Sequence, residues 1–267
     1  MIYIKENTMD RINNWADDSI YVLTDFDRTI TTGNSPSSWS ILSNSNMISN
    51  EYVKDSYELY NYYRPVELDE SMDYETRCKL MIEWWDKHVD LFIKYGLSEE
   101  GINDSIRNFN FMSFREGIKE FLENMNDRNI PVIIISAGIG NVIKEFFIMN
   151  DCFYNNMFIV SNFLKFENGF VVGVSDKVIH SLNKSEVSLP DDIKELIKTR
   201  QNIILLGDSL SDVRMAMEEV RDNALKIGFL EENVVDNKTY FEKKFDVVCT
   251  NNCSYNELSS KIKILRR

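Results

Sequence analysis

The sequence has few of the residues that build disulfide frameworks, zinc clusters or repetitive chains. Its 267 residues include four cysteines, two histidines, four prolines and ten glycines. Cysteines this few and this scattered argue against a disulfide framework, and two histidines do not suggest a zinc cluster. With 43% hydrophobic residues, the chain is neither disordered nor collagen-like. We expect one large domain or a core with an insertion, with reduced thiols.

Long apolar runs and positive charge are also scarce. No stretch reaches the roughly 18 uninterrupted apolar residues of a membrane span, and residues 1–14 lack the apolar run of a signal peptide. We therefore expect a cytoplasmic protein without a membrane partner. The 43 acidic side chains outnumber the 30 basic ones, which gives a formal net charge of −13. This balance argues against binding to nucleic-acid polymers, and any anionic substrate would need local positive charge.

Three short apolar runs end in small or acidic residues. The runs and the residues that follow them are 21–24 before Asp25-Phe26-Asp27, 130–135 before Ser136-Ala137-Gly138, and 202–206 before Gly207-Asp208-Ser209. Helical patterns at 141–150 and 212–220 come after the second and third runs. Strands that alternate with helices predict a parallel sheet covered on both faces, with a ligand crevice at the carboxyl ends of the strands. The polar residues should therefore converge.

Residues 35–113 lie between the first two runs and have few strand signals. Aromatic and apolar residues recur there at three-to-four-residue spacing, which predicts an amphipathic helix. They are Met81, Trp84, Trp85, His88, Leu91, Phe92 and Tyr95. We interpret 35–113 as a helical cap domain inserted into a core of 1–34 and 114–267. The aromatic stripe either packs helices together or contacts a ligand.

Later segments complete the predicted α/β fold. An Asn-Gly pair at 168–169 lies between the β-prone runs 159–163 and 170–174, which predicts a β-hairpin. Further expected elements are strands at 224–229 and 246–249 and a closing helix at 254–265. The expected architecture is a Rossmann-like parallel sheet with an inserted helical cap and a hairpin.

Two carboxylates follow the first apolar run. A loop that begins at Asp25 can present both Asp25 and Asp27 to one point, although such pairs are common in solvated loops. Here they are joined, in sequence order, by Ser136, Lys184 and the segment 207–212. Singly, these residues could cap helices or lie on the surface. Their joint occurrence favours a site.

Four motifs follow one another along the chain: DxDxT, a strand that ends in Ser, a Lys, and GDxxxD. This order resembles the haloacid dehalogenase (HAD) superfamily of phosphotransferases. Three stretches resemble the cytosolic pyrimidine 5'-nucleotidases: 130–140 (IPVIIISAGIG), 178–184 (VIHSLNK) and 203–216 (IILLGDSLSDVRMA). With the first motif and Glu83-Trp84-Trp85, the similarity covers most of the chain. It implies a HAD-type fold and a phosphomonoesterase for nucleoside 5'-monophosphates.

The chemistry of such an enzyme explains the residue types. Asp25 would attack phosphorus and form an aspartyl-phosphate, which divides one difficult step into two. Two unit charges about 4 Å apart repel by about 4 kcal/mol at an effective dielectric constant near 20, so the site needs a cation. Mg²⁺ suits oxygen ligands. The resemblance implies that these are the Asp25 side chain, the Asp27 backbone carbonyl and Asp208.

The resemblance also implies how the proton moves. Asp27 would protonate the leaving oxygen and then take a proton from the attacking water. Superfamily members that dehalogenate lack an acid at this position and the ion-pumping ATPases carry Thr. An aspartate at position 27 therefore favours a phosphatase.

The remaining polar residues would hold the phosphate. Ser136 and the backbone around Ala137, close to a helix start, would bind phosphate oxygens, and Lys184 would neutralise charge. Lys177 is the rival for this lysine, but the match to the nucleotidase stretch favours Lys184. Asp212 would orient Lys184 or metal-bound water rather than bind the metal directly.

The expected cap carries the candidate for substrate choice. Segment 62–69 (YYRPVELD) resembles the nucleotidase segment whose Glu contacts the base, which makes Glu67 a candidate base contact. The alternative is a solvated surface residue.

Two departures from the family pattern leave the substrate open. Ser38-Trp39-Ser40 replaces Cys-His-Asn, and Lys87-His88-Val89 replaces Lys-Ser-His. A sugar phosphate therefore stays an alternative small phosphorylated substrate. A non-catalytic binding module is the alternative from another class, although every polar residue of the motifs is present. The sequence carries no signal of oligomeric state.

Overall fold

Seven strands form one mostly parallel sheet. The structure is a computed structural model that describes residues 1–43, 48–108, 112–175, 177–184 and 189–266. The sheet order is β1-β9-β8-β7-β2-β3-β4, in which β1 pairs antiparallel with β9 and the other neighbours pair parallel. The strands are β1 (Ile2–Ile4), β2 (Ile20–Thr24), β3 (Val132–Ile139), β4 (Met157–Asn162), β7 (Asn202–Gly207), β8 (Leu225–Leu230) and β9 (Val247–Thr250). This is the predicted Rossmann-like α/β architecture.

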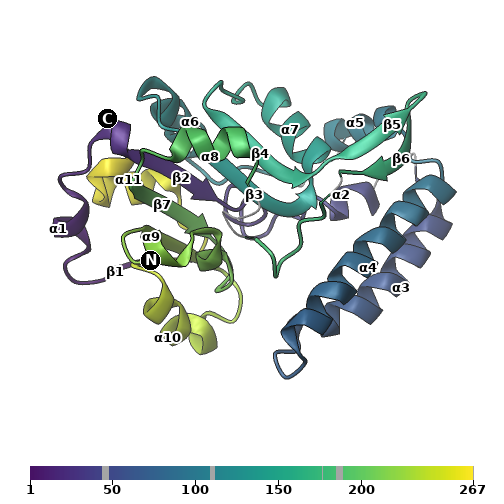
Figure 1. Ribbon diagram of the computed structural model, residues 1–267, viewed down its shortest axis with the longest axis horizontal. Helices are drawn as coiled ribbons and strands as arrows, with labels where there is room; N and C mark the ends of the chain where they lie inside the picture. The colour runs from purple at the N-terminus through teal and green to yellow at the C-terminus, as the bar shows by residue number, and fades with distance from the viewer. Residues whose placement is uncertain (44–47, 109–111, 176, 185–188, 267) are drawn as a thin grey trace.

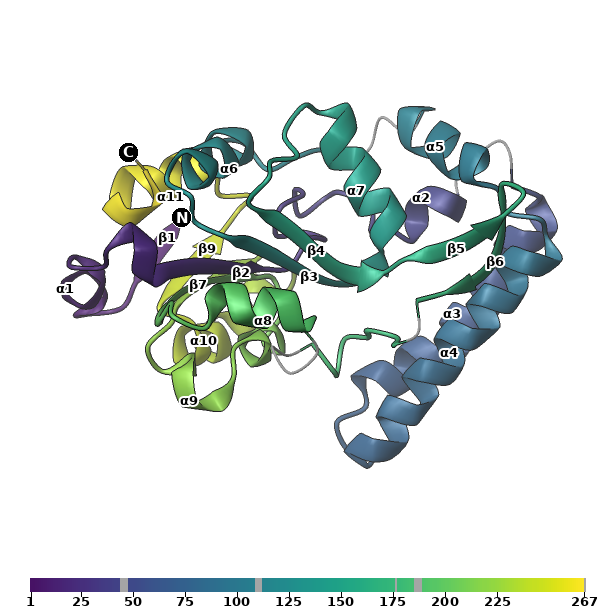
Figure 2. The ribbon, with the colours of Figure 1, turned by 45° about the horizontal axis from the view of Figure 1, so that its top comes forward.

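The central strands are apolar throughout because helices cover both faces of the sheet (Figures 1 and 2). β2 is buried along its whole length. One face packs against α6 (Ile118–Asp127), α7 (Gly140–Met149) and α11 (Tyr255–Lys261). The opposite face packs against α8 (Asp191–Ile197) and α10 (Val234–Lys244). The chain also forms a short helix α1 (Thr8–Ile12) near its start.

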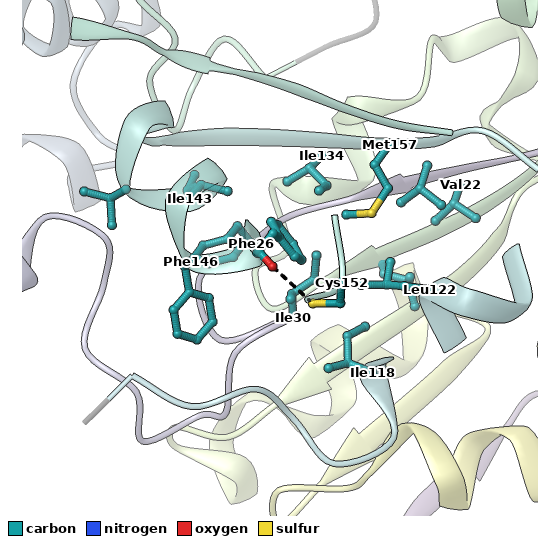
Figure 3. Packing of buried hydrophobic residues seen from close by; sticks show 14 of the residues in the cluster. Val22, Phe26, Ile30, Ile118, Leu122, Ile134, Ile143, Phe146, Cys152 and Met157 are labelled. Carbon is teal, nitrogen blue, oxygen red and sulfur yellow. Dashed lines mark hydrogen bonds between the residues drawn. The ribbon is translucent and has the colours of Figure 1, made fainter. Parts of the chain in front are cut away.

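The first acidic loop is anchored in the core by Phe26 (Figure 3). Its ring packs edge to face on Phe146 and Phe147 of α7, with centroids 6.1 and 5.6 Å apart. Phe26 is fully buried. A fully buried aromatic ring contributes roughly 1.5–3 kcal/mol of hydrophobic stabilisation. The ring therefore fixes the loop at the residue between Asp25 and Asp27.

The hairpin uses a different first arm from the one predicted. Its arms are β5 (Leu164–Glu167) and β6 (Phe170–Val174), while most of 159–163 belongs to β4 in the main sheet. β4 pairs with β3, whose apolar run offers it a buried partner. The turn is as predicted, because Asn168 and Gly169 both adopt positive φ (50° and 82°), which a tight hairpin turn requires.

The predicted helix at 212–220 is broken. A 3₁₀ turn spans Asp212–Met215 and a short helix α9 spans Glu218–Arg221, with extended backbone at Ala216 between them. The guanidinium of Arg221 donates to the carbonyl of Ala216 at 2.8 and 3.1 Å. This side chain satisfies a carbonyl that a continuous helix would have bonded, so the break leaves no unpaired acceptor there.

The closing helix ends earlier than predicted. α11 covers Tyr255–Lys261, and a 3₁₀ turn covers Lys263–Leu265. Ser254 and Glu257 form a capping box at its start, which fixes where the helix begins.

The described part of the segment 35–113 is mostly helical, as predicted. Its helices are α2 (Ser40–Ser43), α3 (Asn50–Leu68), α4 (Tyr74–Lys94) and α5 (Glu99–Asn108). α3 and α4 form an antiparallel pair that projects beside the sheet (Figure 1). The β5–β6 hairpin joins this segment, since Val171 N–H donates to Leu97 O and Glu99 N–H donates to Gly169 O, both at 2.9 Å. Among the described residues, no helix combines the length and apolarity that crossing a bilayer requires.

The aromatic stripe of α4 packs against Trp39. Trp85 and His88 lie 4.2 and 4.8 Å from the Trp39 ring, measured between centroids. Trp84, one residue along, stacks instead on Tyr63 of α3 at 5.8 Å. The stripe therefore holds α4 to its neighbours. Burial lowers the pKa of His88 to about 4, and its Nδ1 has no hydrogen-bond partner within the described part of the chain.

The depressed pKa of His88 predicts acid sensitivity. The unfolded imidazole takes up a proton near pH 6.5, whereas the buried one does so only near pH 4. The free energy of unfolding should therefore fall between these pH values, by up to about 1.4 kcal/mol per pH unit from this residue. Urea titrations from pH 7 to 4.5 should show a shallower loss in His88→Phe than in wild type. Parallel curves would contradict this.

Candidate active site

The carboxyl ends of β2, β3 and β7 meet at one edge of the sheet. In the parallel register Thr24 lies opposite both Ile134 and Leu206. The backbone N–H of Asp25 donates to Leu206 O at 3.0 Å, which continues this pairing into the acidic loop. The residues at the carboxyl ends of the three strands, among them Asp25, Ser136 and Asp208, are thereby brought to the same edge.

A single lysine joins two of the aspartates. Lys184 Nζ donates to Asp25 Oδ1 and to Asp212 Oδ1, the latter at 3.3 Å. The side chains of Lys184, Asp25 and Asp212 are only 11%, 5% and 1% exposed. Lys177 is exposed. The structure therefore places Lys184, and not its rival, among the carboxylates.

Three carboxylates gather around that lysine. One oxygen from each of Asp25, Asp208 and Asp212 lies within 4.8 Å of the others. All three possible metal ligands are carboxylate oxygens, with no sulfur or nitrogen among them. Hard divalent cations prefer such ligands. Asp212 is the least available of the three, because its Oδ2 accepts from Ser209 N–H at 2.9 Å while its Oδ1 faces Lys184.

Burial and mutual repulsion perturb these groups strongly. Burial raises the pKa of Asp25 to about 7, against the opposing charge of Lys184. Burial also raises the pKa of Asp208 well above its usual range, and the charges of Asp25 and Asp212 add to the effect. For Lys184, burial acts to lower the pKa, but the charges of Asp212 and Asp25 outweigh it and raise the pKa. Carboxyl groups with shifted pKa values around one ammonium group are typical of functional sites.

Asp27 is held by Ser38. Its two carboxylate oxygens accept from the Ser38 backbone N–H at 2.9 Å and from the Ser38 hydroxyl at 3.1 Å. Burial raises the pKa of Asp27, and the bonds from Ser38 oppose this rise. A Cβ on Gly138 would lie 2.0 Å from Ser38 Oγ, so only glycine allows this approach to β3. Sequence reasoning noted Ser38 only as a departure from a motif.

Ser136 and Ala137 lie within an irregular end of β3 rather than after it. The register shifts between Ile135 and Ile139. Ser136 is buried, and its Oγ accepts from Gly138 N–H at 3.1 Å. α7 begins directly afterwards, at Gly140, where the first N–H groups of a helix have no internal partner.

Two buried residues that sequence reasoning missed hold the site loops. Asn162 Oδ1 accepts a hydrogen bond from Ile179 N–H, and Asn162 Nδ2 donates one to Ile179 O, both at 2.7 Å. These two bonds fix the loop before Lys184. Arg115 donates to Arg28 O at 2.6 Å and to Thr29 O at 3.2 Å. It thereby fixes the acidic loop. Neither residue belongs to a local pattern that would have revealed it.

Glu67 lies on α3 in an ion pair with Arg64. Its side chain is 14% exposed. Its charge acts on His180, in the loop before Lys184: burial lowers the pKa of His180 to about 4, and the charge of Glu67 opposes that change.

Solved structures define the class of protein. A HAD family hydrolase from Salmonella enterica serovar Typhi matches with a TM-score of 0.62 at 14% identity, over 97% of this chain and 74% of that one. At that identity the likeness shows the fold alone. The cytosolic 5'-nucleotidase IIIB, solved with cytidine bound, matches with a TM-score of 0.88 at 26% identity, over 99% of this chain and 93% of that one. The protein has the α/β fold of a HAD-type hydrolase.

A sequence relative and a family model narrow this class. The 7-methylguanosine phosphate-specific 5'-nucleotidase of Homo sapiens is 35% identical over 240 residues, which cover 86% of this chain and 79% of the relative. The model of the pyrimidine 5'-nucleotidase (UMPH-1) family matches residues 21–265. The chain belongs to the pyrimidine 5'-nucleotidase family. It is a hydrolase of phosphomonoesters, of the 5'-nucleotidase type, which confirms the predicted family and enzyme class over a non-catalytic module.

The raised pKa of Asp208 predicts that the metal-free protein is destabilised by its own site. A carboxyl whose pKa is raised on folding costs stability as the pH rises from about 3.8 through the folded pKa. Asp208→Asn should therefore raise the midpoint temperature of thermal unfolding in a chelator at pH 8.5 and have little effect near pH 4.

Asp191→Asn is the matched control for this measurement. The side chain of Asp191 is 99% exposed in a surface pair with Lys194, so its loss should leave the midpoint unchanged. An Asp208→Asn protein that unfolds at or below the wild-type temperature at pH 8.5 would refute the prediction.

Proposed function

We propose that the protein hydrolyses nucleoside 5'-monophosphates with Mg²⁺, through an aspartyl-phosphate on Asp25. The observation that carries this proposal is the buried contact of Lys184 Nζ with both Asp25 and Asp212, beside Asp208. An ammonium group in this position favours the charged form of Asp25 at the edge of the sheet, against the effect of burial. It also offsets the repulsion between that carboxylate and a phosphate dianion.

The residues of the chain divide the reaction between them. Asp25 attacks phosphorus while the bond to the ester oxygen breaks, and Asp27 gives its proton to that oxygen. Asp27 then takes a proton from the water that attacks the acyl-phosphate, which returns Asp25 as a free carboxylate. Ser38 supports this role because it fixes both oxygens of Asp27. Burial raises the pKa of Asp27, which favours its protonated form.

Phosphate binding falls to the end of β3 and to Lys184. The Ser136 hydroxyl and the backbone at Ala137 precede the start of α7, whose free N–H groups favour anions. Lys184 compensates charge on the nucleophile and on the phosphoryl group. Asp212 orients Lys184, since both its oxygens already accept hydrogen bonds.

The oxygen cluster fits Mg²⁺. The Asp25 side chain, the Asp27 backbone carbonyl and Asp208 would hold the ion, which suits a hard cation that binds through one or two carboxylates. When bound, Mg²⁺ supplies positive charge that offsets the carboxylates and the phosphate.

Substrate choice would lie with the inserted helices. We propose a core of 1–34 and 114–267 and a cap of 35–113, with Glu67 facing the base. The half-buried position of Glu67 near the Lys184 loop supports this assignment. The names of the relatives suggest 7-methylguanosine monophosphate and cytidine monophosphate as first substrates, and a cytosolic location.

The nucleophile predicts the effect of one substitution. Asp25→Asn should lower kcat for nucleoside monophosphates by about 10³-fold or more, because the amide cannot form the covalent intermediate. Phosphate release measured with Mg²⁺ tests this, and Asp191→Asn should keep the wild-type rate. Undiminished turnover by Asp25→Asn would refute the mechanism. A wild-type enzyme that prefers sugar phosphates would instead refute the nucleotide substrate.

A further inference from the structure

The loop segment before Lys184 is anchored to the core at Ile179. Asn162, which is fully buried, pairs with both the N–H and the carbonyl of Ile179. Inside the loop, Asn183 Oδ1 accepts from His180 N–H at 2.8 Å and Asn183 Nδ2 donates to Val178 O at 2.9 Å. These bonds close residues 178–183 into a compact turn.

The tip of the α3–α4 pair is also well fixed. Asp73 caps α4, since its carboxylate accepts from Thr76 N–H at 2.9 Å and from the Thr76 hydroxyl at 3.0 Å. The guanidinium of Arg77 donates to Glu67 O, which ties the first turn of α4 to the last turn of α3. Tyr74 is the first residue of α4 and therefore projects from a rigid base.

Tyr74 connects the loop segment before Lys184 with the turn end of the α3–α4 pair. Its hydroxyl donates to Leu182 O at 2.6 Å, across 108 residues of sequence. Leu182 lies two positions before Lys184. Figure 2 shows the loop after β6 beside the turn end of the α3–α4 pair. Tyr74 is 47% exposed, so this bond contributes little to the buried core.

We propose that Tyr74 is a positioning residue that makes the placement of Lys184 depend on the position of the cap. The inference rests on the proposed function and adds to it a link between the two parts. Lysine carries its charge on a flexible four-carbon stem, so the backbone just before it determines where Nζ can reach. The bond from Tyr74 fixes that backbone when α4 lies against the loop. Without it, Lys184 would occupy its place between Asp25 and Asp212 less often.

Tyr74→Phe tests the link because it removes one hydroxyl and keeps the ring. Binding of inorganic phosphate in the presence of Mg²⁺, measured by calorimetry, reports on Lys184 without any contact from a base. We expect binding to weaken roughly two- to tenfold, the range for loss of one hydrogen bond. kcat/KM for nucleoside monophosphates should fall by a similar factor, while the midpoint of thermal unfolding stays near that of wild type.

Tyr57→Phe is the matched control. Tyr57 lies on α3, is 63% exposed and stacks on Tyr60. Its substitution should change neither phosphate binding nor turnover. A loss in Tyr74→Phe no greater than in Tyr57→Phe would overturn the proposal.

A double substitution separates positioning from a general effect on the fold. In the Lys184→Gln background, Tyr74→Phe should cause no further loss of phosphate affinity, because the group that it positions is gone. An equal loss in both backgrounds would overturn the proposal. If the wild-type protein releases no phosphate from any nucleotide, the proposed function fails, and the binding comparison still decides whether Tyr74 acts through Lys184.

Discussion

Repulsion among buried and partly buried carboxylates around Lys184 is the constraint on which this site depends. Asp25, Asp208 and Asp212 bring oxygens within 4.8 Å of one another, in a chain that already carries a net charge of −13. Water would screen such charges, but burial removes much of that screening. One ammonium cannot balance three carboxylates and an incoming phosphate. This excess of negative charge supports the proposal that a further cation completes the site.

Buried polar residues hold the charged groups in place against this repulsion. Arg115 binds the backbone of the acidic loop, Asn162 binds the loop before Lys184, and Ser38 binds both oxygens of Asp27. Phe26 fixes the same acidic loop from the opposite side through the apolar core. Removing one partner from such buried pairs leaves an unsatisfied group, at a cost of about 1–3 kcal/mol. These residues thus hold the mutually repelling charges in a fixed geometry.

Residues at strand ends could be predicted from the sequence, whereas residues that act across the fold could not. Asp25, Ser136 and Asp208 follow apolar runs, and parallel strands bring their carboxyl ends together. The apolar pattern of 159–163 suits both β3 and β6 as a partner strand. The prediction that this run forms an arm of the hairpin is therefore wrong, since most of it pairs with β3. Ser38, Asn162, Arg115 and Tyr74 bond to backbone or side-chain atoms far along the chain, and no periodicity marks such contacts.

The charge deficit of the site can be measured directly through the protons that Mg²⁺ displaces. Because burial raises the pKa of Asp25 to about 7 and that of Asp208 well above its usual range, the metal-free protein should hold protons there near pH 6. Calorimetric titration with Mg²⁺ in buffers of different ionisation enthalpy counts the protons released. The account predicts about one proton or more per ion at pH 6, with fewer at pH 9. Mg²⁺ binding at pH 6 without proton release would contradict it.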